Sequence, residues 1–238
     1  MAKKRPLLME ANARRRLEWC IQNRNKPPEF WLSIIFSDEA SIERGAGHRR
    51  SWTFRYPGEK LDTNKVDTYN KSKGLRVMVW AAITLTEKTE LIIMRRDQTT
   101  LKKGYTSNSY LDVLDEALHT IYTLERRFQQ DNAPVHTAIK VRRYFSSKGV
   151  VLLDWWPAYS PDLNPIEHLW SYLKKRLYEL YPDVELWKGS DDDITKRMES
   201  ALFEAWRSID DGVVAACVNS MRSRIEACIA ADGWYTKY

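Results

Sequence analysis

A run of seven apolar residues at 77–83 constrains the fold more than any other feature of the sequence. The run, VMVWAAI, has no alternating polar positions, which is typical of a strand buried on both faces. Both faces of such a strand must be covered by another layer, so we expect helices on either side of a sheet. The composition, 43% hydrophobic with ten tryptophans, is sufficient for a large core. The sequence therefore predicts an α/β fold.

Shorter apolar runs predict further strands at 33–36, 91–94, 127–131 and 150–153, with the first three strands of the chain in an antiparallel meander. A glycine-containing turn predicts a hairpin within 41–56. One-sided apolar stripes predict helices at 10–22, 108–124 and 137–147, followed by three more at 166–180, 194–209 and 214–228. The expected architecture is a mixed five-stranded sheet flanked by helices, with additional C-terminal helices.

The first 28 residues are polar and basic and end at Pro27 and Pro28. This predicts an N-terminal arm or linker at 1–28 and one domain at 29–238. For the arm, nuclear localisation, DNA contact and a plain linker are all open. The net charge of +6 favours an anionic partner such as nucleic acid, although a merely basic protein is an equal alternative on charge alone.

No apolar run approaches the roughly 18 residues that a membrane-spanning helix needs, so no membrane partner is expected. The basic N-terminus leads into no apolar stretch, which argues against a secretory signal. Cys20, Cys217 and Cys228 fit neither a disulfide framework nor a zinc site. They indicate reduced thiols in an intracellular protein.

Three acidic residues occupy positions that often carry chemistry. Asp38 and Asp131 each end a predicted strand, and Glu167 lies in the first turn of a predicted helix. If the two strands are neighbours, both aspartates emerge at one edge of the sheet, where ligand sites are common. Carboxylates bind Mg²⁺, and two such ions about 3.5–4 Å apart serve phosphodiester chemistry. Asp38, Asp131 and Glu167 are therefore candidate catalytic and metal-binding residues.

Each carboxylate also has an ordinary structural interpretation. Asp38 and Asp131 could be turn residues at strand ends. Glu167 has the strongest alternative, because Asn164 would cap the helix, Pro165 would take its first position, and Glu167 would complete a capping box. Spacing alone does not separate the two interpretations.

Four segments considered together resemble the catalytic core of mariner-like DDE transposases. They are FSDEA at 36–40, VMVWA at 77–81, QDNAPVHTA at 130–138 and YSPDLNPIEHLW at 159–170. MRSR at 221–224 and the TKY ending are also similar to that family. The resemblance implies a fold like ribonuclease H and retroviral integrase, and the spacing from Asp131 to Glu167 lies in the family's narrow range.

By the same resemblance, Asp38, Asp131 and Glu167 match the three catalytic acids, with two Mg²⁺ or Mn²⁺ ions as cofactors. The implied reaction is phosphodiester cleavage followed by attack of the freed 3′-hydroxyl on target DNA. Double-stranded DNA, as transposon ends and target, and a homodimer are the implied partners. The expected location is the nucleus, or otherwise the cell interior. Relatives begin with helix-turn-helix modules that this sequence lacks, so recognition of element ends stays open.

Other polar residues near the carboxylates are candidates for supporting roles: Asn132, His136, Asn164 and His168. Either histidine could orient a ligand, contact a phosphate or be merely structural. Asn164 is interpreted first as a helix cap and second as a DNA contact. Glu39 should point away from Asp38, because neighbouring strand residues face opposite sides. Candidates for nucleic-acid contact are Arg44, Arg49, Arg50, Lys174 and Lys175, with a solvated charged face as the alternative.

Three functions compete. The first is an active nuclease and strand transferase of cut-and-paste transposition. The second is a non-catalytic DNA-binding or dimerisation remnant, or a captured domain, that keeps the fold. The third is another enzyme of the same fold, such as a ribonuclease H or a junction resolvase. The SPDLNPIE segment at 160–167 favours a transposase over the third.

Overall fold

The computed structural model describes residues 7–44 and 75–238. Most of the hairpin predicted at 41–56 lies outside these ranges, as do Arg49 and Arg50.

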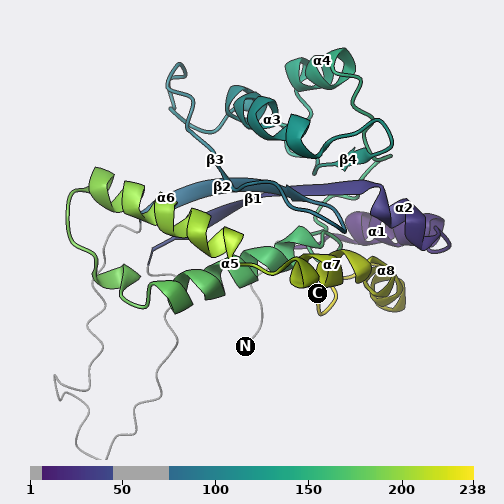
Figure 1. Cartoon of the computed structure of the whole chain (residues 1–238). Coiled ribbons are helices and arrows are strands. Elements are labelled where there is room, and N and C mark those ends of the chain that lie inside the picture. Colours follow the sequence, from purple (N-terminus) through teal and green to yellow (C-terminus); the bar gives the residue numbers. More distant parts are fainter. Residues whose placement is uncertain (1–6, 45–74) are drawn as a thin grey trace, which may run out of the picture.

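A mixed sheet forms the centre of the molecule (Figure 1). Within the described ranges it has four strands, β1 (Ile34–Glu43), β2 (Arg76–Ile83), β3 (Ile92–Ile93) and β4 (Arg127–Gln129), in the order β3-β2-β1-β4. The antiparallel pairing of β1 with β2, and of β2 with β3, confirms the predicted meander. β4 runs parallel to β1, with Phe36 beside Gln129, so the strand that contains Asp38 and the strand that precedes Asp131 are neighbours.

The fifth strand predicted at 150–153 does not form. Only Leu152 makes a single parallel bridge, to Phe128. Phe128 donates its N–H to Val151 O and accepts from Leu153 N–H, but the chain leaves the sheet before a second pair is made. The segment is too short to pair further, because it lies between the turn at Gly149 and the loop that reaches Pro157.

β1 is longer than predicted, and this changes the position of Asp38. Pairing with β2 continues from Phe36 to Glu43, and the alternate residues Ala40 and Ile42 are buried. The polar residues at 37–39 therefore do not end the strand. Asp38 lies within β1, beside Ala81 of β2.

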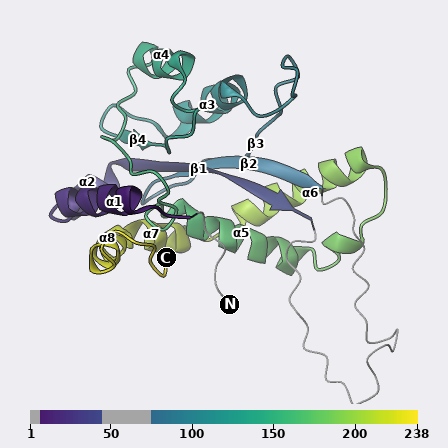
Figure 2. The ribbon, with the colours of Figure 1, turned by 180° about the vertical axis from the view of Figure 1, so that it is seen from behind.

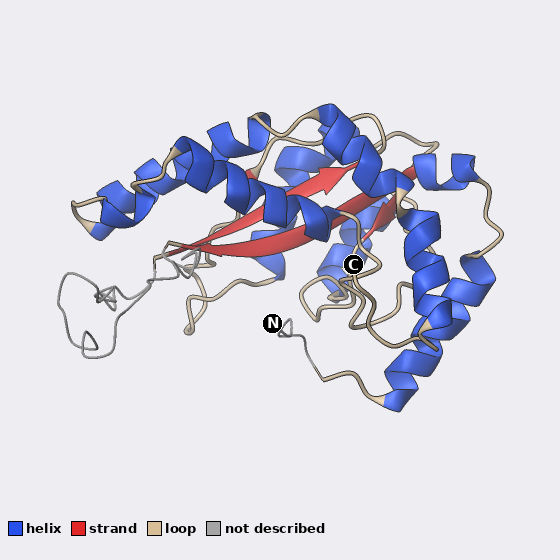
Figure 3. Ribbon diagram, turned by 90° about the horizontal axis from the view of Figure 1, so that it is seen from below, coloured by secondary structure: helices blue, strands red, loops and turns tan. Residues whose placement is uncertain are grey.

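Helices cover both faces of the sheet (Figures 1 and 2). On one face, α3 (Ser107–Ile121) and α4 (Ile139–Ser147) pack in a core with Ile35, Trp80 and Phe128. On the other, α5 (Ile166–Leu180), α6 (Asp191–Arg207), α7 (Asp211–Asn219) and α8 (Met221–Ala230) pack with Phe36 and Val79. Figure 3 shows the strands from below, among these helices. Burial of Val79 and Trp80 on opposite faces confirms the prediction from residues 77–83.

The last predicted helix, 214–228, is divided into α7 and α8 at Ser220. The hydroxyl of Ser220 donates to the carbonyl of Cys217 (2.6 Å) and accepts from Arg224 Nε (2.7 Å), which stabilises the bend. The remaining elements are α2 (Pro28–Leu32) and the short 3₁₀ helix η2 (Val184–Leu186). None of the helices that the structure describes has the length and apolar character to cross a bilayer.

The first helix, α1 (Glu10–Asn23), packs along α8 and buries Trp19 and Cys20. Its Arg16 is fully buried and donates two hydrogen bonds of 2.8 Å to the carboxylate of Asp162, in the loop before α5. Burial alone would raise the pKa of Asp162, but the hydrogen bonds and charge of Arg16 hold that pKa below its ordinary value. The basic N-terminal segment therefore contributes a structural cation to the core.

Arg16→Ala is expected to lower the free energy of unfolding by about 3–5 kcal/mol, because it leaves the Asp162 carboxylate buried without its partner. Arg14→Ala, which removes an exposed pair with Glu10 on the same helix, should cost less than about 1 kcal/mol. Urea unfolding of both variants measures the difference. Equal effects of the two substitutions would contradict a structural role for the buried pair.

Candidate active site

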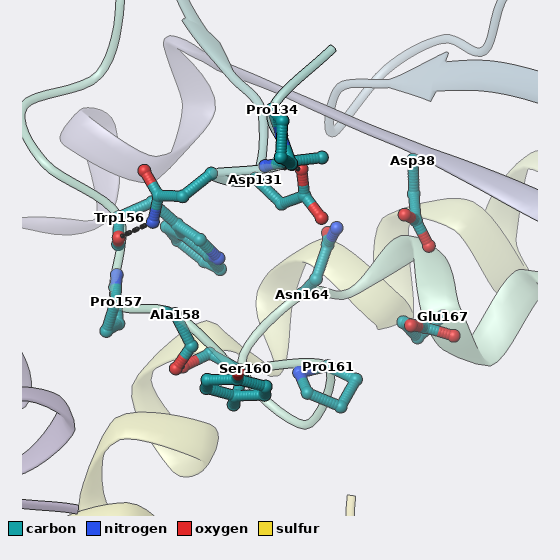
Figure 4. Close-up of a pocket in the computed structure, with 13 residues that line it drawn as sticks. Asp38, Asp131, Pro134, Trp156, Pro157, Ala158, Ser160, Pro161, Asn164 and Glu167 are labelled. Carbon is teal, nitrogen blue, oxygen red and sulfur yellow. Dashed lines mark hydrogen bonds between the residues drawn. The ribbon is translucent and has the colours of Figure 1, made fainter. Parts of the chain in front are cut away.

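The three predicted acids line one pocket of about 420 Å³ (Figure 4). It is formed by β1, the turn after β4, the loop at 156–161 and the first turn of α5. The carboxylates of Asp38 and Asp131 point into the same open space, and Glu167 lies nearby on α5. The structure thus brings together residues that are far apart in the sequence.

Asp38 is half-buried at the side of this pocket, and its Oδ2 accepts a hydrogen bond of 2.9 Å from the indole N–H of Trp170. Loss of hydration, followed by the nearby charges of Glu167 and Glu39, raises the pKa of Asp38 well above its usual value. Trp170 follows Glu167 by three residues, so both project from the same side of α5. One turn of α5 therefore contributes an acid to the pocket and a donor to Asp38.

Asp131 lies two residues beyond β4, in a turn, so the strand is shorter than the predicted 127–131. Its Oδ1 accepts from the backbone N–H of Ala133 (2.8 Å) and contacts Nδ1 of His136 (2.6 Å). Burial alone would raise the pKa of Asp131, but the hydrogen bond and charge of His136 hold it below the ordinary value. The pKa values of the two acids are therefore shifted in opposite directions. Burial and anionic neighbours raise the pKa of Asp38, whereas a cationic neighbour lowers that of Asp131.

The capping interpretation of Asn164 is wrong. No side chain caps the N-terminus of α5, whose flanking residue is Pro165. The amide of Asn164 instead donates to the carbonyl of Ser37 (3.1 Å) and so ties the start of α5 to β1. Without a cap at Asn164, no capping box forms with Glu167, whose side chain lines the pocket.

His136 links Asp131, in the turn after β4, to Glu39 of β1. It is 3% exposed, and while Nδ1 contacts Asp131, Nε2 lies 3.2 Å from Oε1 of Glu39. Burial would lower the pKa of His136, but the two carboxylates raise it to about 10. Glu39 lies on the opposite side of β1 from Asp38, toward α3, as the strand geometry predicts.

The other supporting candidates hold loops in place. Asn132 donates to the carbonyl of Trp156 (2.6 Å), which ties the turn after β4 to the loop on the far side of the pocket. His168 contacts the buried Arg224 (2.5 Å), and Arg224 also donates to the carbonyl of Asp162 (2.7 Å).

Lys174 and Lys175 are exposed on α5, about 10 Å along the helix from Glu167 at 1.5 Å per residue. Lys175 also pairs with Glu179 (3.6 Å). Arg44 already makes an intramolecular hydrogen bond, because its guanidinium donates to the carbonyl of Trp187 (3.0 Å). The two lysines therefore lie at the surface of the helix that carries Glu167.

Oxygen donors suited to a hard divalent cation surround the pocket. Within the described ranges, no three Asp, Glu, His or Cys side chains are already close enough to ligate one ion. Asn164 Oδ1, however, is buried at the pocket and has no hydrogen-bond partner among the residues described. This orphaned acceptor and three carboxylates, one with a raised pKa, fit a site that gains positive charge or ordered water when occupied.

Sequence reasoning missed several residues on which the site depends. Trp170 could have been found from its position three residues after Glu167 on one helical face. Arg16 could not, because it is separated from Asp162 by 146 residues and carries no local signal.

Comparison with known proteins agrees with this arrangement. The sequence model of the DDE superfamily endonucleases matches residues 33–185. The Tc1 transposase of Caenorhabditis elegans is 32% identical over 240 residues, covering 99% of this chain and 81% of that protein. The Tcb1 transposase of Caenorhabditis briggsae is 34% identical over 239 residues, with the same coverage.

Two solved structures show the same fold. The Mos1 strand transfer complex aligns with a TM-score of 0.74 at 23% identity, over 100% of this chain and 66% of that chain. The Mos1 catalytic domain with raltegravir and Mg aligns with a TM-score of 0.63 at 22% identity, over 97% of this chain and 100% of that chain. The chain therefore belongs to the DDE superfamily endonucleases, as the catalytic domain of a transposase of the Tc1/mariner type.

Asp38→Asn is expected to stabilise the metal-free protein at neutral pH by roughly 0.5–2 kcal/mol, as is common when a strained functional group is neutralised. The folded-state pKa of Asp38 is raised, so its ionisation costs stability as pH rises through that pKa. Thermal unfolding in EDTA should therefore show a gain that shrinks toward pH 4. Asp112→Asn, on the exposed side of α3, is the control, and a gain independent of pH would refute the explanation.

Proposed function

We propose that this chain cleaves DNA phosphodiester bonds and transfers the freed 3′ end to target DNA, in cut-and-paste transposition. The observation that carries the proposal is the single open pocket shared by Asp38, Asp131 and Glu167. We assign these three as the catalytic and metal-binding residues. Asn132, His136, Asn164 and His168 are assigned supporting roles.

Two divalent ions, Mg²⁺ or Mn²⁺, are the proposed cofactors, held by Asp38, Asp131 and Glu167. When bound, such ions activate the attacking oxygen and stabilise charge on the leaving oxygen. The solved relatives include Mos1 structures with Mg and with Mn. The raised pKa of Asp38 supports the assignment, because a cation stabilises a carboxylate that has lost hydration and relieves its repulsion with nearby acids.

The protein's own contribution is positioning and charge. Trp170 fixes one oxygen of Asp38, and Ala133 and His136 fix one oxygen of Asp131. The free amide oxygen of Asn164 can accept from a water molecule at the pocket wall. Fixed dipoles and charges of this kind lower a barrier without reorganisation during the reaction.

Double-stranded DNA, as element ends and as target, is the proposed substrate. Lys174 and Lys175 would contact phosphates along α5, with Arg44, Arg49 and Arg50 as further contacts. Mos1 relatives were solved as paired-end and strand transfer complexes. We infer a homodimer, since two ends must be brought together.

We further propose that residues 29–238 form the catalytic domain and that 1–28 precede it, with α1 packed against the domain. Because the proposed substrate is DNA, we infer that the protein acts in the compartment that contains the cell's DNA. The basic residues at 3–5, together with the exposed Arg14 and Arg15, would suit import into a nucleus.

The alternative is a non-catalytic remnant that retains the fold. The convergence of three carboxylates from separate elements on one pocket favours the enzyme, because a remnant has no function that offsets the cost of holding like charges together. Metal binding and DNA cleavage distinguish the active enzyme from the non-catalytic remnant.

Millimolar Mn²⁺ is expected to raise the melting temperature, because a ligand at about 100 times its Kd stabilises the folded state by about 2.7 kcal/mol. Asp131→Asn should abolish most of this shift, whereas Asp112→Asn should retain it. Differential scanning fluorimetry with EDTA as the reference measures both. A melting curve that does not respond to Mn²⁺ would rule out the metal site.

Purified protein is expected to nick supercoiled plasmid in Mn²⁺, and Asp131→Asn and Glu167→Gln should each reduce the rate by at least about 100-fold. Removal of one charge-stabilising group commonly costs about this much. Agarose gels resolve the nicked and supercoiled forms. Absence of nicking by a wild-type protein that binds Mn²⁺ would favour the remnant.

A further inference from the structure

The carboxylate of Asp131 is asymmetric. Its Oδ1 receives two donors, the backbone N–H of Ala133 and Nδ1 of His136, at 2.8 and 2.6 Å. The Asp131 side chain is nevertheless 56% exposed, and it points into the pocket (Figure 4). With Oδ1 occupied, Oδ2 is the oxygen available to a cation.

The His136 ring that sets this orientation is itself fixed on three sides. Nδ1 faces Asp131, Nε2 faces Glu39 at 3.2 Å, and one ring face lies against Tyr110 with 4.1 Å between centroids. Tyr110 donates to Gln130 Oε1 (2.8 Å), and the Gln130 amide donates to the carbonyl of His136. The ring is therefore held by β1, α3 and its own turn.

Glu39 has no place in the pocket, yet it is only 20% exposed on its side chain and its partner is the His136 ring. Placing a carboxylate there has a desolvation cost that a surface position would avoid. Hydrogen bonds behind a ligating carboxylate orient it and tune its affinity for metal. Two neighbouring residues of β1 would thus have different roles. Asp38 is itself an acid of the pocket, and Glu39 would orient Asp131 through His136.

We propose that Glu39 is a positioning residue that acts through His136 to keep one oxygen of Asp131 turned into the pocket. The inference rests on the proposed role of Asp131 as a metal ligand. It adds that the length of the side chain at position 39 matters more than its charge, because the carboxylate must come within 3.2 Å of His136 Nε2.

Two substitutions separate reach from charge. Glu39→Asp keeps the charge but is one methylene too short to contact Nε2, and it should weaken Mn²⁺ binding about tenfold. Glu39→Gln keeps the length and an acceptor oxygen, and it should bind Mn²⁺ within about twofold of wild type. Glu43→Ala, on the same side of β1 and paired with Arg76 at the surface, is the control. Isothermal titration calorimetry with Mn²⁺ and no DNA measures the affinities.

A second comparison tests whether the effect passes through the imidazole. In His136→Asn the shorter amide can still donate to Asp131, but it cannot reach Glu39. Glu39→Asp should therefore cause no further loss of Mn²⁺ affinity in the His136→Asn background. ¹⁵N NMR should show that the His136 Nε2 resonance moves in Glu39→Asp and stays near its wild-type position in Glu43→Ala.

The outcomes distinguish this inference from the proposed function. If Glu39→Gln weakens Mn²⁺ binding as much as Glu39→Asp, charge is what matters and the positioning role is overturned. Additive losses in the double variant would also overturn it. If Asp131→Asn binds Mn²⁺ as tightly as wild type, the metal site itself fails.

Discussion

The buried contact between Arg16 and Asp162 is the interaction on which the rest of the site depends. Asp162 lies in the loop that leads from the pocket wall to α5, and Arg16 holds it from α1, more than 140 residues away in the chain. The same guanidinium donates to the carbonyls of Tyr159 and Gly233. A loop with several buried polar groups is stable only when each has a partner, and one arginine supplies many of them.

Arg224 completes this arrangement from α8. It donates to the carbonyl of Asp162 and contacts His168, the residue after Glu167. The start of α5 is therefore held by two buried arginines and by Asn164, which bonds to Ser37 of β1. This explains how Glu167 is directed at the pocket although no side chain caps its helix. The position of the acid depends on tertiary contacts and not on local helix chemistry.

The strand β1 connects both sides of the site. Its side chains alternate, so Asp38 faces the α5 layer and Glu39 faces the α3 layer. The two environments are electrostatically opposite. Burial, followed by the nearby acids, raises the pKa of Asp38, whereas the hydrogen bond and charge of His136 lower the pKa of Asp131. A bound cation would therefore stabilise the charge of Asp38 and relieve its repulsion with the neighbouring acids.

The sequence by itself determined the chemistry and the layers of this protein. The apolar run at 77–83 and the helical stripes are patterns of short-range periodicity, so they could be interpreted locally. The acidic motifs are identified by their resemblance to a known family, because position and spacing alone leave each acid with a structural interpretation. Only the tertiary structure decided that Asp38 lies inside a strand, that Asn164 bonds to β1 rather than capping α5, and that Arg16 is a core residue. These features depend on pairing between segments that are distant in the chain, with no local signal. Which partner a buried polar group finds is determined by the packing of the whole domain.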